Sequence, residues 1–385
     1  MANGAASASR SSPGAVKVGI SGWRYKPWRG VFYPEGLKQD RELHFASRQL
    51  PTIEINGTFY NLQRPEYFRR WAAETPHYFV FAVKCPRFIT HIKRLKDVEA
   101  PLANFYATGV LTLGPKLGPF LWQFPPNFKF DPERIETFFE MLPRDAAEAA
   151  SLARRRADRP FSRPRIPAAG NRPLRHAMEI RNESFRDPAF IDLLRKYDVA
   201  VVCADTVEWP RLMDLTSDFV YCRLHGSEVL YTSGYDDAAL DKWAARIVAW
   251  VNGKEAPDGD RASPQPGPKL AKRDVFVYFD NDVKVRAPRD AHSLIVKLEK
   301  LLGRRLGSSE AVDESAQRSM DAKATAAPAI PGPRARSRRA SERRKTLAEE
   351  PRTTPPGSSG RSKQAKSAKR PRKAKPSRVK PRKAA

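Results

Sequence analysis

The stretch VAVVCAD, residues Val199–Asp205, is a short run of small and β-branched apolar residues that ends on a carboxylate. Runs of this length that are rich in β-branched or aromatic residues are typical of buried strands. The stretch therefore predicts a strand with Asp205 at its carboxyl end.

The same kind of run recurs seven more times along the chain, which makes eight candidate strands. The other seven are Val16–Ser21, Thr52–Gly57, Phe79–Lys84, Pro119–Phe124, Arg175–Arg181, Phe219–Gly226 and Asp274–Asn281. Helical patterns lie between several of them, and two begin at Asp131 and Asp187, each followed by a proline. An Asp N-cap with Pro at the first helical position is a helix start signal. Strands that alternate with helices predict a parallel sheet, and eight such units predict a single (β/α)₈ TIM barrel, an α/β fold.

Composition divides the chain into three parts. Residues 1–15 are small and polar and are expected to be disordered, and residues 16–303 carry the barrel. Residues 304–385 are rich in Lys, Arg and Pro, and they hold too little apolar surface to offset the entropy of folding, so we expect a disordered tail. Within the barrel, the Ala-, Arg- and Pro-rich segment 144–172 predicts a surface excursion, and residues 255–272 predict a Pro- and Gly-rich loop.

Positive charge is concentrated in the C-terminal tail. The chain has a net charge of +27, and residues 308–385 hold 22 Lys or Arg against 7 Asp or Glu. Such charge asymmetry indicates contact with a polyanion. We therefore predict that the tail binds nucleic acid, either DNA or RNA. One alternative is that the tail only keeps the protein soluble, and another is that its basic runs are a nuclear-localisation signal, which requires a eukaryotic host.

Cysteine usage and the N-terminus predict a cytoplasmic protein. The three cysteines, Cys85, Cys203 and Cys222, have no CxxC spacing, so neither a disulfide framework nor a structural zinc site is expected. The N-terminal segment lacks the apolar core of a signal peptide, and no apolar run reaches the roughly 18 residues of a membrane span. The sequence contains no GxGxxG, Walker, HExxH or GxSxG motif, so it gives no support for a nucleotide cradle or a serine hydrolase.

Polar residues end nearly all the predicted strands, which is where TIM-barrel enzymes place their chemistry. Because side chains two positions apart share a strand face, Glu54 and Asn56 are expected to point the same way. Other such pairs are Glu179 with Arg181 and Arg223 with His225. We predict that one pocket at the C-terminal mouth is lined by Glu54, Lys84, Glu179, Arg181, Asp205 and His225. The alternative is a closed ion network, in which the carboxylates only pair with the cations.

An aromatic cluster after the first strand also has two interpretations. Its members are Trp23, Tyr25, Trp28, Phe32 and Tyr33. Rings at this density often cover the end of a barrel. Alternatively, they form a wall on which a sugar ring or a base stacks.

Eight sequence motifs occur together in a fixed order. They are GISGWRYKPWRGVFYP, TIEINGTFYNLQRPEYFRRW, FAVKCPRFITH, LGPFLWQFPPNF, EIRNESF, ADT, YCRLHG and VYFDND. From about Val16 to Gly303 the chain thereby resembles the YecE-like family, the domain of unknown function numbered 72. The resemblance implies a TIM barrel and a site at its mouth, but no particular reaction. It also places His91 at the mouth, although His91, His176 and His292 show no ligand spacing and their pattern favours structural roles.

This chain departs from the family pattern at two places. Asp280 stands where the family usually has a first Asn before the one matched by Asn281. The usual Arg-His-x-x-Trp after the fifth strand is replaced by RNESF, residues 181–185.

The first functional hypothesis is an enzyme, a hydrolase, lyase or isomerase that acts on a polar or anionic substrate. Glu54 and Glu179 are the candidate acid and base, because two carboxylates in unlike environments can divide these roles. His225 would be a second proton carrier, and Asp205 completes the candidate catalytic set. The candidate substrate-binding residues are Trp23, Asn56, Tyr60, Lys84, His91, Gln123, Arg181, Arg223 and Asn281. Three of them, Lys84, Arg181 and Arg223, would hold anionic groups of the substrate.

Two alternatives stay open at this point. In a metal variant, Glu179, Asp205, His225 and Asp280 would coordinate manganese or zinc, which accept oxygen and imidazole ligands. In the other, the barrel is a binding module without turnover that recognises a sugar, a nucleotide or a nucleic-acid fragment.

Overall fold

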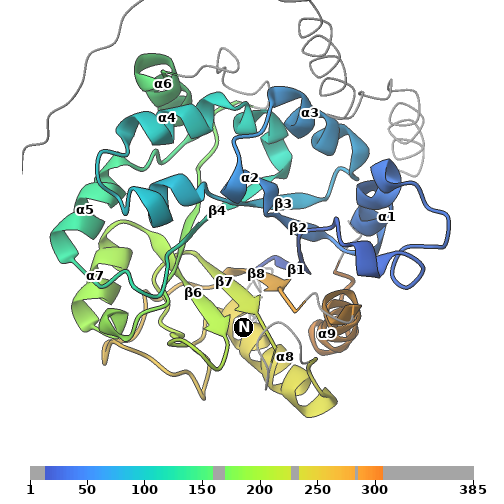
Figure 1. The fold of residues 1–385 in the computed structure, drawn as a ribbon. Coiled ribbons are helices and arrows are strands. Elements are labelled where there is room, and N and C mark those ends of the chain that lie inside the picture. The colour runs from blue at the N-terminus through green and yellow to red at the C-terminus, as the bar shows by residue number, and fades with distance from the viewer. Residues whose placement is uncertain (1–13, 159–169, 227–233, 282–284, 307–385) are drawn as a thin grey trace, which may run out of the picture. The chain divides into compact units, whose positions relative to one another are not determined.

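Eight parallel strands form a closed barrel in chain order, β1 to β8 (Figure 1). The computed structural model describes residues 14–158, 170–226, 234–281 and 285–306. The strands are β1 (Val16–Ser21), β2 (Thr52–Ile55), β3 (Val80–Lys84), β4 (Leu117–Gln123), β5 (His176–Glu179), β6 (Val199–Asp205), β7 (Phe219–Leu224) and β8 (Asp274–Phe279). Each overlaps one of the eight predicted runs, and β8 pairs with β1 to close the sheet. The predicted TIM barrel is therefore confirmed.

Alternate residues of each strand face the inside of the barrel. The inner layer includes Ala82, Leu121, Ala177, Val202, Tyr221 and Tyr278. On most strands the residue two positions after an inner one is polar, and these residues are Lys84, Gln123, Glu179, Arg223 and Asp280. Thr52 belongs to the same layer, since its Oγ1 lies 2.8 Å from the hydroxyl of Tyr278, and Glu54 follows it. The polar ends of these strands thus converge inside the mouth.

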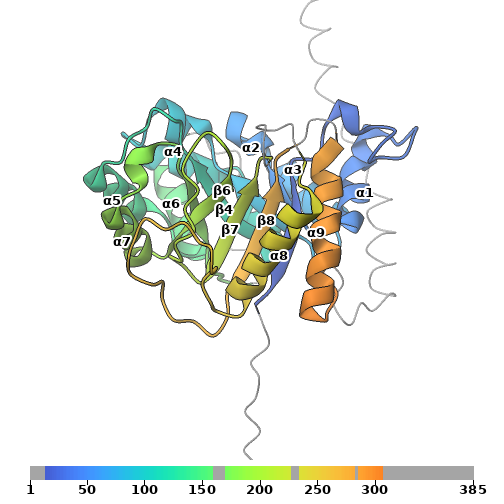
Figure 2. The ribbon, with the colours of Figure 1, turned by 90° about the horizontal axis from the view of Figure 1, so that it is seen from below.

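Helices surround the barrel, and their buried faces cover the outward-facing residues of the strands (Figures 1 and 2). The α-helices are α1 (Glu42–Gln49), α2 (Gly57–Tyr60), α3 (Pro65–Glu74), α4 (Glu99–Ala107), α5 (Pro132–Met141), α6 (Ala146–Arg156), α7 (Pro188–Lys196), α8 (Asp237–Val251) and α9 (Arg286–Leu302). Shorter helical segments are η1 (Lys26–Trp28), η2 (Gln39–Arg41), η3 (Phe88–Ile92), η4 (Val110–Lys116) and η5 (Glu183–Phe185). The start signals at Asp131 and Asp187 are confirmed, because each carboxylate accepts a hydrogen bond from a backbone N–H of the first turn.

The segment 144–172 contains a helix that the sequence interpretation did not include. Its first half forms α6, which packs against α4 on the outside of the ring (Figure 1). The buried face of α6 consists of Ala146, Ala149, Ala150 and Ala153. Alanine has the highest helix propensity, and its small side chain lets two helices approach closely. Residues 159–169 of the predicted excursion lie outside the described residues.

The predicted loop 255–272 contains no helix or strand in the structure. It is anchored by the carboxylate of Asp214, which accepts hydrogen bonds from the backbone N–H groups of Ala262 and Ser263. The predictions for residues 1–13 and for the tail from residue 307 onward fall outside the described residues and stay predictions. In the part of the chain that the structure describes, no helix is both long and apolar enough to cross a membrane.

Candidate active site

Arg223 stands at the centre of a buried ion cluster at the C-terminal mouth. Its Nη2 atom lies 3.0 Å from Glu54 Oε1 and 2.8 Å from Asp280 Oδ2. Its Nη1 atom lies 2.8 Å from Glu179 Oε2. A single guanidinium therefore holds carboxylates that come from the ends of β2, β5 and β8.

The cluster keeps the carboxylates of Glu179 and Asp280 ionised. Burial by itself would raise the pKa of Glu179, but Arg223 and then Arg181 lower it well below its usual range. The pKa of Asp280 is likewise lowered, by Arg223 and then by His225, against the effect of burial. Neither carboxyl therefore carries a proton at neutral pH.

Both oxygens of Glu54 are occupied by hydrogen-bond donors. Ser21 Oγ donates to Oε1 at 2.5 Å, and the hydroxyl of Tyr221 donates to Oε2 at 2.7 Å. Arg223 donates to both oxygens, through Nη2 and Nε. Asn56 Nδ2 in turn donates to Ser21 Oγ at 3.0 Å. Glu54 is thus fixed as an acceptor in a network that spans β1, β2 and β7.

Arg181 extends the cluster toward the rim of the barrel. Its Nε and Nη2 atoms both donate to Glu179 Oε1, at 2.8 and 2.7 Å. Its guanidinium carbon lies 4.0 Å from the ring centroid of Trp209, which is a cation–π contact. Its Nη1 atom has no hydrogen-bond partner among the described residues, so it stays available to a ligand.

His225 lies beside Asp280, whereas Asn281 turns outward. The Nδ1 atom of His225 is 3.2 Å from Asp280 Oδ2, and its ring meets Trp209 edge-on at 5.8 Å between centroids. Asn281 is buried, and its Nδ2 donates to Asp290 of α9 at 2.8 Å. His225 therefore joins the cluster, while Asn281 joins β8 to its helix.

The amine of Lys84 titrates close to neutral pH. Its side chain is 9 % exposed, and its Nζ lies 4.5 Å from the centroid of the Phe59 ring. Within the described residues, Nζ makes no ion pair or hydrogen bond. Burial, and then the charge of Arg223, lower the pKa of Lys84 to about 8, although the nearby carboxylates oppose this shift.

The low pKa of Lys84 predicts that its charge destabilises the folded protein. At pH 7 the amine is protonated in both the folded and the unfolded state, and a lowering from about 10.4 to about 8 corresponds to about 3 kcal/mol. We expect Lys84→Met to raise the free energy of unfolding at pH 7 by up to this amount. This stability gain should shrink between about pH 8 and pH 10. In that range the unfolded wild type binds a proton at Lys84 that the folded wild type does not, so the stability of the wild type rises with pH and approaches that of the variant. Urea denaturation at several pH values measures this, and a loss of stability at pH 7 would contradict it.

His91 lies at the mouth on η3, the location that the resemblance implies. Thr90 Oγ1 is 2.8 Å from its Nδ1, and its ring meets Phe59 edge-on at 5.1 Å. Burial, then Arg87 and Arg181, lower the pKa of His91 to about 4. The imidazole is therefore neutral at physiological pH.

The structure does not bring Asp205 into the cluster. On β6 the inner residue near the mouth is Ala204, so the next side chain points toward the helices. Asp205 Oδ1 accepts a hydrogen bond from Arg211 at 2.9 Å, and Oδ2 accepts one from Trp243 Nε1 of α8 at 3.3 Å. The expectation that Asp205 lines the same pocket as Glu179 is corrected, because a one-residue change of position reverses the face of a strand.

The four residues of the metal variant therefore do not converge. Asp205 faces α8, and the carboxylates of Glu179 and Asp280 bind Arg223. Across the described ranges, no group of three His, Cys, Asp or Glu side chains is arranged to hold a metal ion.

The other predicted binding residues occupy three different places. Trp23 is nearly buried and packs edge-on against Trp71 at 5.4 Å, which favours the interpretation that the aromatic cluster covers the barrel end. Gln123 is buried at the carboxyl end of β4, in register with Glu179. Tyr60 is 64 % exposed at the end of α2.

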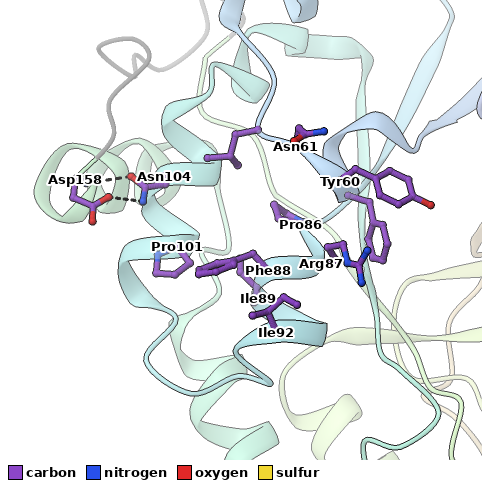
Figure 3. A pocket seen from close by; sticks show the side chains of 12 residues that line it. Tyr60, Asn61, Pro86, Arg87, Phe88, Ile89, Ile92, Pro101, Asn104 and Asp158 are labelled. Carbon is purple, nitrogen blue, oxygen red and sulfur yellow. Dashed lines mark hydrogen bonds between the residues drawn. The ribbon is translucent and has the colours of Figure 1, made fainter.

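A surface groove of about 690 Å³ opens beside the mouth, between α2, η3 and α4 (Figure 3). Its walls expose large apolar side chains: Tyr60, Phe88 at 50 % and Ile92 at 60 %. Phe59 also lines the groove, and the amine of Lys84 lies over its ring, 4.5 Å from the centroid. The groove and the buried mouth therefore share a wall.

Two further buried polar atoms at the mouth have no hydrogen-bond partner among the described residues. They are the side-chain amide oxygen Oδ1 of Asn56 and the indole nitrogen Nε1 of Trp209. Buried polar groups are nearly always hydrogen-bonded. An unmatched acceptor and an unmatched donor beside Glu54 and Arg181 therefore indicate a place for a polar ligand.

Sequence reasoning missed two residues of this site. Tyr221 lies two positions before Arg223 on the same inner face, so the strand alternation could have found it. Trp209 comes from the loop after β6, and no local signal connects it with Arg181. Only the tertiary structure brings the side chains of Trp209 and Arg181 together.

Comparisons with known proteins agree with this architecture. A family model described as "Protein of unknown function DUF72" matches residues 17–313. UPF0759 protein YunF of Bacillus subtilis is 26 % identical over 125 residues, which cover 31 % of this chain and 43 % of that protein. UPF0759 protein YecE of Escherichia coli K12 is 27 % identical over 113 residues, 29 % of this chain and 39 % of that protein. The matched region thus spans less than half of these curated relatives.

Solved structures show the same fold. A DUF72 family protein from Thermotoga maritima has a TM-score of 0.54 at 23 % identity, covering 75 % of this chain and 100 % of that one. A DUF72 family protein from Enterococcus faecalis has a TM-score of 0.52 at 15 % identity, covering 77 % and 100 %. Because the family model matches most of the chain and the barrel agrees with it, this chain belongs to the family of proteins of unknown function DUF72.

Proposed function

We propose that the chain is an enzyme that acts on a polar, anionic substrate at the barrel mouth, with Lys84 as its acid–base group. The observation that carries this proposal is the amine of Lys84, which is buried beside Arg223 and has no partner among the described residues. Proton transfer is most effective when the pKa of the catalytic group lies near ambient pH, and the pKa of Lys84 is about 8. Reactions that begin by removing a proton are typical of lyases and isomerases, so these classes fit the site better than a hydrolase.

In this proposal, the acid–base role passes from Glu54 and Glu179 to Lys84. The pKa of Glu179 is lowered by Arg223, and both oxygens of Glu54 already accept hydrogen bonds. The two carboxylates would instead hold Arg223 in position. The charge of Arg223 in turn lowers the pKa of Lys84.

Arg181 supports an anionic substrate. Its Nη1 is not used by any described residue, and Trp209 holds the guanidinium plane at the rim. Arginine presents its donors in a fixed fork that matches carboxylate and phosphate groups. A substrate anion bound there would lie on the same side of the barrel as Lys84.

A screen for turnover tests the proposal. The full chain is incubated with pooled carboxylated and phosphorylated metabolites, and mass spectrometry identifies what is consumed. For a compound found in this way, we expect kcat/KM to rise with pH around a midpoint of about 8, because only the neutral amine accepts a proton. Lys84→Arg should lower kcat/KM by about 10²–10⁴-fold.

Lys116 provides the matched control. The pKa of its amine is also lowered to about 8, by burial and then by Arg48. Its Nζ, however, donates hydrogen bonds to the backbone oxygens of Ala72 and Thr75, before the start of β4 and so at the opposite end of the barrel. A folded Lys116→Arg variant should keep its turnover. Equal turnover by wild type and Lys84→Arg would refute the role of Lys84, and a ligand retained unchanged by both would identify a binding module.

We also propose that the tail, residues 304–385, binds nucleic acid. The proposal is supported by the 22 Lys or Arg residues between residues 308 and 385, which are spaced by prolines. Such a chain contacts phosphates through release of counterions, without reading the bases.

A further inference from the structure

We infer that Lys84 is a nucleophile, which captures the carbonyl carbon of an aldehyde or ketone that carries an anionic group. This inference rests on the proposed function, because it assumes a substrate bound at the barrel mouth. It adds the chemical class of that substrate and a covalent step in which the amine takes part.

The position of Nζ supports this role. Lys84 is the last residue of β3 and faces inward, and its amine lies over the ring of Phe59 rather than in a hydrogen-bonded cage. An amine attacks through its lone pair, so a hydrogen-bonded cage that holds it in place hinders the approach of a carbonyl carbon. Lys116 is held in such a cage by Ala72 and Thr75. The two lysines thus share a pKa of about 8 but differ in their freedom to react.

The charges around Lys84 favour the neutral, nucleophilic form. A lysine becomes a nucleophile when it is desolvated or lies next to another cation. Both conditions hold here, since burial and Arg223 are the two largest causes of the lowered pKa. At about pH 7.5, a pKa of about 8 leaves roughly two hundred times more neutral amine than the usual lysine value of about 10.4.

The step balances without an oxidant or a reductant. The lone pair of Nζ forms a bond to the carbonyl carbon, and the π electrons of the carbonyl move to its oxygen. The oxygen takes up both hydrogens of the neutral amine in turn and leaves as water, which gives an imine. One further proton from solvent makes the imine cationic. The cation draws electrons from the neighbouring carbon, so that carbon can lose a proton or break a bond to its next carbon, as isomerases and lyases require.

Residues near Lys84 fit the rest of such a substrate. Arg181 offers its Nη1 to a carboxylate or phosphate, and His91 presents a neutral imidazole against the same Phe59 ring. Beyond Phe59, the groove lined by Tyr60 and Phe88 has room for an apolar or planar part (Figure 3). The site would therefore accept a carbonyl compound with an anion on one side and a ring or short apolar chain on the other.

Reductive trapping tests the inference with a single probe. Pyridoxal 5′-phosphate combines an aldehyde, a planar ring and a phosphate, and sodium borohydride converts its imine into a stable secondary amine. The full chain is treated briefly with limiting probe at about pH 7.5 and then reduced, and labelled peptides are identified by mass spectrometry. We expect Lys84 to be labelled about tenfold faster than Lys116, whose amine is held by hydrogen bonds, and faster still than the exposed lysines. Its rate should rise with pH around a midpoint of about 8. Lys84→Arg should remove this label, and Arg181→Gln should slow it.

The outcomes separate this inference from the proposed function. Labelling of Lys84 no faster than of Lys116 would overturn the inference. If Lys84→Arg abolishes a turnover that borohydride does not interrupt in the wild type, Lys84 acts as a base only, and the inference fails while the proposed function stands. If Lys84 is trapped but its substitution leaves turnover unchanged, the proposed function fails. Circular dichroism confirms the folding of each variant, and Lys84→Met replaces Lys84→Arg if the arginine is not accommodated.

Discussion

Replacing Arg223 with methionine is expected to lower the free energy of unfolding by about 3–5 kcal/mol at neutral pH. Methionine fills part of the volume but leaves Glu54, Glu179 and Asp280 buried without their shared cation. An unpaired buried charge costs far more than an intact buried pair contributes. Arg223 is fully buried and donates to carboxylates at the ends of three strands, so the substitution should destabilise the ends of β2, β5 and β8 together.

The pH dependence of this loss has a definite sign. In the wild type, the pKa values of Glu179 and Asp280 are lowered, so their contribution to stability is present above the unfolded values of about 4 and disappears as pH falls through the folded values. Without Arg223 the buried carboxylates resist ionisation, and folding becomes costlier as pH rises above about 4. The difference in the free energy of unfolding between wild type and Arg223→Met should therefore be largest at neutral pH and shrink toward pH 4. Urea denaturation at a series of pH values measures it.

Two control variants show what the prediction depends on. Arg223→Lys keeps the charge but cannot reach three carboxylates at once, because an ammonium lacks the planar fork of the guanidinium. It should lose less stability than Arg223→Met. Arg211→Met removes a cation that pairs with Asp205 outside the cluster, and its side chain is more than a third exposed, so it should cost about 1 kcal/mol or less. Similar losses for Arg223→Met and Arg211→Met would contradict the central role of Arg223.

Removing the tail is expected to abolish most of the affinity of the chain for nucleic acid. A protein that makes 6–10 phosphate contacts loses about 10³–10⁵ in affinity between 50 and 200 mM salt. With 22 basic residues between positions 308 and 385, the full chain should lose affinity by a factor of this size over the same salt range, on DNA and RNA of any sequence. A chain truncated after Leu306 should bind weakly and with a shallower salt dependence. Fluorescence anisotropy with a labelled oligonucleotide measures both.

The same truncation checks the independence of the barrel. Leu306 is the last described residue, and its backbone N–H donates to Glu299 of α9, so the cut keeps every described contact of the last helix. We expect the melting temperature to change little, because the tail has no periodic apolar face to pack. A large loss of stability would contradict this division of the chain. Equal binding by the two chains, or binding that ignores salt, would show that the tail is not the nucleic-acid contact.

The strands and the polar mouth follow from the sequence by itself. Each strand buries a short run of β-branched and aromatic residues, so composition over six or seven positions is enough to locate it. The alternation of side chains then predicts which polar residues share a face, and Glu54, Glu179 and Arg223 do meet inside the mouth. The eightfold repeat of strand and helix determines the closed barrel.

Other features depended on the tertiary structure. Asp205 ends β6 like the other polar residues, but Ala204 holds the inner position, and only the observed register shows that its carboxylate reaches α8. The α6 helix lies in a segment that is also rich in arginine and proline, so its sequence pattern did not predict a helix with an alanine face that packs on α4. The pKa of Lys84 is lowered by burial and then by Arg223, which lies far from it in the sequence. Electrostatic effects depend on distance and burial in space. The sequence therefore determined most of the charged groups that meet at the mouth, whereas the fold decided that Asp205 is not among them and that the amine of Lys84 has no partner among the described residues.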